Sequence, residues 1–60
     1  MDLKEKLKEI LKTEKVITPG MITQRMTISR EDVVDNLEEL LKEEYVVKYG
    51  KHVYEYREAL

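Results

Sequence analysis

Two signals for the start of a helix lie close together in this sequence of 60 residues and limit the folds open to it. Thr18 directly precedes Pro19, a pair that suits the N-cap and the first helical position. Ser29, followed three residues later by Asp32, suits a second N-cap with a capping box. The stretch between them has room for about two helical turns and a tight corner. The sequence therefore predicts two helices that meet at a turn near Thr27.

The flanking segments predict one more helix and a β-hairpin. Apolar residues recur at helical spacing near the N-terminus, and β-branched and aromatic residues dominate the C-terminal part on both sides of Gly50. Helices are expected at about 2–14, 19–26 and 29–44, and hairpin strands at 45–49 and 52–56, with a short strand at 16–17 beside them. Together they form an α+β fold, a winged helix-turn-helix, in a single domain over residues 1–60.

The apolar residues define the expected core. In the second helix, Ile22 and Met26 should point inward and Met21 outward, because inward positions recur every three to four residues. The other expected core positions of the helices are Leu3, Leu7, Ile10, Leu11, Val33, Val34, Leu37, Leu40 and Leu41. Which face of the hairpin packs inward stays open, since a slip of one residue exchanges its two faces.

The predicted turn between the second and third helices lacks a glycine. Turns of this kind often contain one, because glycine adopts a positive φ without steric cost. Here the position is occupied by Thr27, whose β-branched side chain disfavours that region. We therefore expect either another turn geometry or local strain.

Composition restricts the class of protein. Without cysteine the chain has neither disulfides nor a cysteine metal site. No apolar run approaches the roughly 20 residues of a membrane span, and the charged N-terminus does not resemble a signal peptide. We expect a soluble, cytoplasmic protein. The scarcity of amides and the abundance of Glu, Lys, Ile and Val resemble proteins from hot environments.

Charge is segregated along the chain, although the formal net charge is only −2. Residues 30–44 contain seven acids and two bases, a net charge of −5, which leaves +3 for the remainder. The helix dipole favours Glu31 and Asp32 in the first turn by about 0.3–1 kcal/mol. It does not explain Asp35 and Glu39, which are like charges four residues apart. The acidic third helix is therefore either an interaction surface or a solubilising one.

The sequence resembles the winged helix-turn-helix family through Ile17-Thr18-Pro19, Ile22-Thr23, Met26, Ile28-Ser29, Val33, Leu37, Leu40 and Tyr45-Val46. It is also distantly similar to the archaeal and eukaryotic small-subunit ribosomal protein family with this fold, but lacks its long basic tail. In winged helices the third helix usually enters the DNA major groove and the hairpin touches the backbone. The resemblance thus implies a DNA-binding transcription regulator with contacts from Gln24, Arg25, Arg30, Val34, Lys48, Lys51 and His52.

Two other functions stay open. The acids Glu31, Asp35, Glu38 and Glu39 repel a polyanion, and would suit a basic protein partner or a mimic of nucleic acid. The ribosomal resemblance implies an RNA-associated module. The sequence has no catalytic motif, phosphate-binding loop or metal-ligand cluster, so no enzyme, cofactor or metal is expected. A homodimer also stays open, because Val34, Leu41 and the tyrosines could form an exposed apolar surface.

Overall fold

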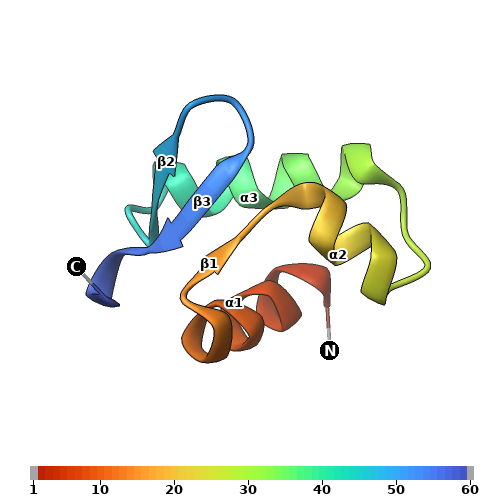
Figure 1. Cartoon of the computed structure of the whole chain (residues 1–60), viewed down its shortest axis with the longest axis horizontal. Coiled ribbons are helices and arrows are strands. Elements are labelled where there is room, and N and C mark those ends of the chain that lie inside the picture. Colours follow the sequence, from red (N-terminus) through yellow and green to blue (C-terminus); the bar gives the residue numbers. More distant parts are fainter. Residues whose placement is uncertain (1, 60) are drawn as a thin grey trace.

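A helix-turn-helix packed beside a β-hairpin makes up the chain in a computed structural model, which describes residues 2–59 (Figure 1). The two end positions of the predicted domain, 1 and 60, lie outside this range. The elements are α1 (Leu3–Glu14), β1 (Val16–Ile17), α2 (Pro19–Arg25), α3 (Arg30–Lys42), β2 (Val46–Tyr49), β3 (Val53–Tyr56) and the 3-10 turn η1 (Arg57–Ala59). The three strands form one antiparallel sheet in the order β1-β3-β2. This α+β, winged-helix-like arrangement confirms the predicted fold class.

Side-chain caps start all three helices. An Asp2 carboxylate oxygen accepts a hydrogen bond from the Glu5 amide at 2.9 Å, and the Thr18 hydroxyl accepts one from Met21 at 3.2 Å. The Ser29 hydroxyl accepts one from the Asp32 amide at 3.1 Å. The cap at Ser29 is therefore confirmed, but the reciprocal side-chain bond of a capping box is absent from the hydrogen bonds of residues 2–58. Helix α3 accordingly begins at Arg30, one residue later than predicted.

The turn between α2 and α3 shows how the chain changes direction at Thr27 without a glycine. Helix α2 ends at Arg25, one residue earlier than predicted, because Met26 is extended with φ −132° and ψ 143°. The Ile28 amide donates to the Met26 carbonyl at 3.0 Å and closes a tight turn. Thr27 does not have a positive φ. The corner thus has another geometry and avoids the left-handed region.

Helix α3 ends at Lys42, two residues earlier than predicted, in a Schellman motif without glycine. The Tyr45 amide donates to the Leu40 carbonyl at 2.9 Å, and the Glu44 amide donates to Leu41 at 3.1 Å. This pattern requires a left-handed residue, and Glu44 supplies it with φ 62°. Lys15 also has a positive φ, 70°, where the chain turns from α1 into β1. Glycine would take both conformations at lower cost.

The hairpin differs from the prediction by one residue at each strand start. Tyr49 pairs with Val53, so the turn contains three residues, 50–52, and His52 lies in it and not in a strand. Gly50 has the expected positive φ, 61°. Val46, Tyr54 and Tyr56 are buried, which identifies the inward face that the sequence left open.

The core lies between the three helices and the inward face of the sheet. It consists of Leu7, Leu11, Ile17, Ile22, Val33, Leu37, Leu40, Val46, Tyr54 and Tyr56. Met26 is half-buried against it, close to the prediction. Met21 also packs against the core, so its predicted outward orientation is wrong. Val34 and Leu41 are only half-buried, because they lie at the margins of the α3 stripe.

Candidate nucleic-acid interface

Helix α3 presents carboxylates to solvent along one side. Glu31, Asp35 and Glu39 are exposed and follow one another at a spacing of four, which places them on one helical face. None of them forms an ion pair within residues 2–58. The negative charge that the sequence predicts on this helix is therefore a surface property of the folded chain.

Glu38, the fourth predicted acidic contact, is half-buried and has partners within the chain. Its Oε2 accepts hydrogen bonds from Lys48 Nζ at 2.8 Å and from the Tyr54 hydroxyl at 2.6 Å. The bond from Lys48, followed by that from Tyr54, lowers the pKa of Glu38, and the carboxylate in turn raises the pKa of Lys48. Lys48 Nζ also lies 5.4 Å from the centroid of the Tyr54 ring. Glu38 and Lys48, predicted to contact different partners, thus contact each other.

Two further ion pairs engage charges near the predicted interface. Arg25, a predicted DNA contact, lies 3.2 Å from a carboxylate oxygen of Glu14 at the end of α1. Lys4 of α1 pairs with Glu43 at the end of α3. Two of the acids in residues 30–44 therefore have lysine partners, which lie 39 and 10 residues away in sequence. Neither pair was predicted from the sequence, because no local pattern marks contacts at such separations.

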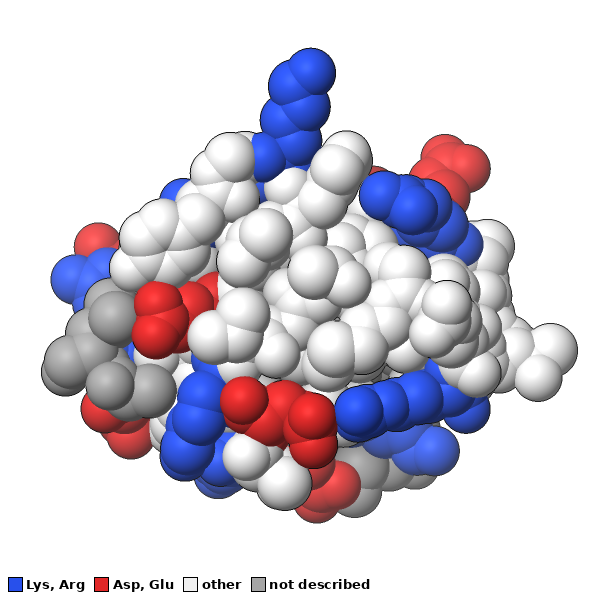
Figure 2. All heavy atoms as spheres, in the orientation of Figure 1, with Lys and Arg blue, Asp and Glu red and all other residues white. Residues whose placement is uncertain are grey.

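The remaining predicted cationic contacts are exposed. Arg30 begins α3, while Lys51 and His52 lie in the β2–β3 turn, and none of the three forms an ion pair or a side-chain hydrogen bond within residues 2–58. In Figure 1, α3 and this turn lie in the upper part of the molecule, and α1 lies in the lower part. Figure 2 shows basic side chains at the upper margin, with acids beside them at the right. Gln24 is exposed on α2, and Val34 is half-buried on α3.

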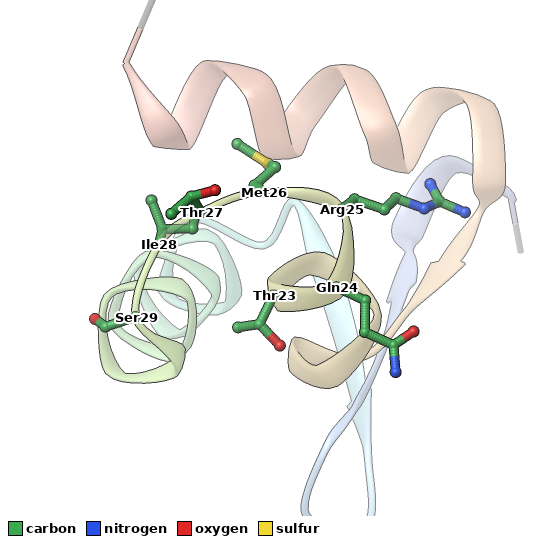
Figure 3. A pocket seen from close by; sticks show the side chains of 7 residues that line it. All are labelled: Thr23, Gln24, Arg25, Met26, Thr27, Ile28 and Ser29. Carbon is green, nitrogen blue, oxygen red and sulfur yellow. The ribbon is translucent and has the colours of Figure 1, made fainter.

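A hollow of about 530 Å³ lies at the turn between α2 and α3. It is lined by Thr23, Gln24, Arg25, Met26, Thr27, Ile28 and Ser29 (Figure 3). The side chains of Gln24, Arg25 and Ser29 point in different directions, and Met26 points toward α1. A small-molecule site needs polar groups that converge on a ligand. This hollow lacks that convergence and is a feature of the turn.

Neither a metal site nor a membrane-spanning helix is present in the described residues. No group of three His, Cys, Asp or Glu side chains in the described part of the chain could hold a metal ion. None of the described helices has the length and apolar character needed to cross a membrane. Comparison with protein-family models, curated proteins and solved structures finds no match to this chain.

Proposed function

We propose that this chain is a small DNA-binding protein of the winged-helix kind that acts in transcription regulation. The observation that carries the proposal is the placement of Arg30 at the start of α3 and of Lys51 and His52 in the β2–β3 turn, all exposed and without acidic partners within residues 2–58. A helix start suits a groove and a hairpin turn suits the adjacent backbone. Arg30 can donate two hydrogen bonds to guanine, while Lys51 and His52 can contact phosphates.

The interface differs from that of a strongly basic DNA-binding domain. Lys48 and Arg25 already have acidic partners, so they contribute little free charge to a phosphate. Asp35 and Glu39 lie further along α3, where they repel the duplex. DNA is therefore expected to contact the start of α3 and the β2–β3 turn, and a single protomer is expected to bind with low affinity. A two-fold dimer would double the number of contacts.

Salt dependence tests this proposal quantitatively. Each neutralised phosphate of B-DNA contributes about −0.9 to the slope of log affinity against log salt. Lys51 is the lysine assigned to a phosphate, and it alone predicts a slope of roughly −1 for one protomer and roughly −2 for a dimer. Fluorescence anisotropy of a labelled random duplex, titrated at several salt concentrations, measures the slope. An undetectable affinity at the lowest salt would reject DNA binding.

Substitutions locate the contacts. Lys51→Gln should weaken binding and flatten the salt slope by about one unit for each protomer. Arg30→Gln should weaken binding to guanine-containing duplexes by about 1–3 kcal/mol, because the contact to the base is lost. Lys12→Gln is the matched control, because Lys12 is an exposed lysine of α1 and belongs to neither α3 nor the β2–β3 turn. An equal effect of all three substitutions would indicate non-specific attraction and contradict the assigned interface.

The exposed carboxylates of α3 favour one second candidate, a domain that binds a basic protein. Glu31, Asp35 and Glu39 form a row that could meet lysines or arginines of a partner. The double substitution Asp35→Lys and Glu39→Lys separates the two functions. A DNA-binding protein gains affinity for the duplex, because repulsion becomes attraction. A domain that binds a basic partner gains no specific DNA affinity and loses its partner.

A further inference from the structure

The sheet has a second face that the DNA proposal does not use. Side chains alternate along a strand, and directly paired residues share a face. Ile17 and Lys48 both pair with Tyr54, and Val46 pairs with Tyr56, so these residues occupy the face toward α3 and the core. The opposite face, which we term the outer sheet face, is formed by Val16, Val47, Tyr49, Val53 and Glu55.

The outer sheet face is unusually apolar for a surface that no element of residues 2–58 covers. Antiparallel sheets with one solvated face normally place polar residues on it. Here four of the five residues are valine or tyrosine, and Val16 and Tyr49 are 42% and 47% exposed. Figure 1 shows the sheet in front of α3, and Figure 2 shows a broad uncharged area over β1, β3 and α2. Contiguous apolar surface of this kind commonly marks an interaction site.

Glu55 indicates what kind of partner this face suits. It pairs with Val16 on one side and with Val47 on the other, so its carboxylate belongs to the middle strand of an apolar surface. No lysine or arginine within residues 2–58 forms an ion pair with it. The Glu55 carboxylate raises the pKa of the Tyr49 hydroxyl on the same face. A partner that covers this face must supply a cation, because an unpaired buried carboxylate is costly.

Glu55 also disfavours two other partners for this face, a second copy of the chain and DNA. A second copy of the chain, packed about a two-fold axis through this face, would bring two Glu55 carboxylates together in a desolvated interface. DNA is excluded as well, since the outer sheet face has one negative and no positive side chain. We propose that the outer sheet face binds a protein segment whose apolar side chains surround one lysine or arginine, which pairs with Glu55.

A peptide selection tests the proposal. The probe is a random heptapeptide library displayed on phage, selected in parallel on the wild-type chain and on Glu55→Lys. Peptides enriched on the wild type should combine apolar residues with a lysine or arginine, whereas Glu55→Lys should enrich apolar peptides with an acid. A synthetic wild-type-selected peptide should bind Glu55→Lys roughly tenfold more weakly or worse, because the new charge repels it.

Two controls make the result specific. Glu39→Lys makes the same charge reversal on α3 and should leave the peptide affinity unchanged. Val16→Thr keeps a β-branched strand residue but removes apolar surface, so it should weaken peptide binding. Circular dichroism confirms that each variant is folded. The proposal is overturned by enriched peptides without a charge preference, by no enrichment, or by a sedimenting dimer that buries this face. Because α3 and the β2–β3 turn are not involved, failure of DNA binding does not affect the outcome.

Discussion

The Glu38 cluster offers the sharpest test of the packing between α3 and the sheet. Replacing Glu38 with glutamine keeps the shape of the side chain but removes the charge that strengthens its bonds from Lys48 at 2.8 Å and Tyr54 at 2.6 Å. Bonds to a charged group contribute about 1 kcal/mol more than neutral ones, which gives about 2 kcal/mol for the two. Because the Glu38 side chain is 39% exposed, solvent screening reduces this to about 1 kcal/mol.

Thermal unfolding followed by circular dichroism measures the effect. A loss of about 1 kcal/mol lowers the midpoint of a domain this small by roughly 4–8 °C. Glu39→Gln is the matched control, since Glu39 is the neighbouring exposed acid without an ion pair within residues 2–58, and it should change stability by less than about 0.5 kcal/mol. Equal midpoints for the two variants would refute the role given to Glu38.

The pH dependence supplies an independent check. The folded-state pKa of Glu38 is lowered below its ordinary value of 4.5, so the stability it contributes is fully present above pH 4.5. That stability is lost as the pH falls through the folded-state pKa. The difference in urea midpoint between wild type and Glu38→Gln should therefore be constant near neutral pH and disappear in acid. A difference that persists unchanged in acid would contradict the assignment.

Three further predictions concern the backbone, a cap and alkaline pH. Glu44→Gly should raise the free energy of unfolding by about 0.5–1 kcal/mol in urea titrations, since relief of the left-handed conformation exceeds the entropy cost of glycine; a decrease would contradict this. Ser29→Ala should cost about 1 kcal/mol by the same assay, whereas Thr27→Ala, outside the cap, should cost much less. The Glu58 carboxylate raises the pKa of Tyr56 from 10.0 to about 12, so the stability from this contact is complete below pH 10.0 and lost as the pH rises through about 12. In Glu58→Gln, ultraviolet absorbance should show tyrosine ionisation at lower pH, and an unchanged titration curve would exclude the contact.

The sequence determined those parts of the structure that depend on neighbouring residues. A helix start is specified by its own first turn, so Thr18 and Ser29 predicted the beginnings of α2 and α3 correctly to within one residue. Helical spacing of apolar residues identified Leu7 and Leu37 among the core residues. Gly50 located the hairpin turn. These signals act over a few residues, and they were sufficient for the fold class.

Only the tertiary structure decided where α3 ends and which charges remain free. Glu44 adopts a positive φ without glycine, in a turn that leads directly into the packed Tyr45 and β2, so no local signal marked the end of α3. Glu38 and Lys48 become partners only when the sheet docks on α3, and that contact changes both from candidate binding residues into structural ones. The choice of hairpin face likewise depends on burial of Tyr54, which leaves Val16 and Glu55 on the outside. Each of these outcomes follows from contacts between segments distant in sequence, and patterns of neighbouring residues do not indicate such contacts.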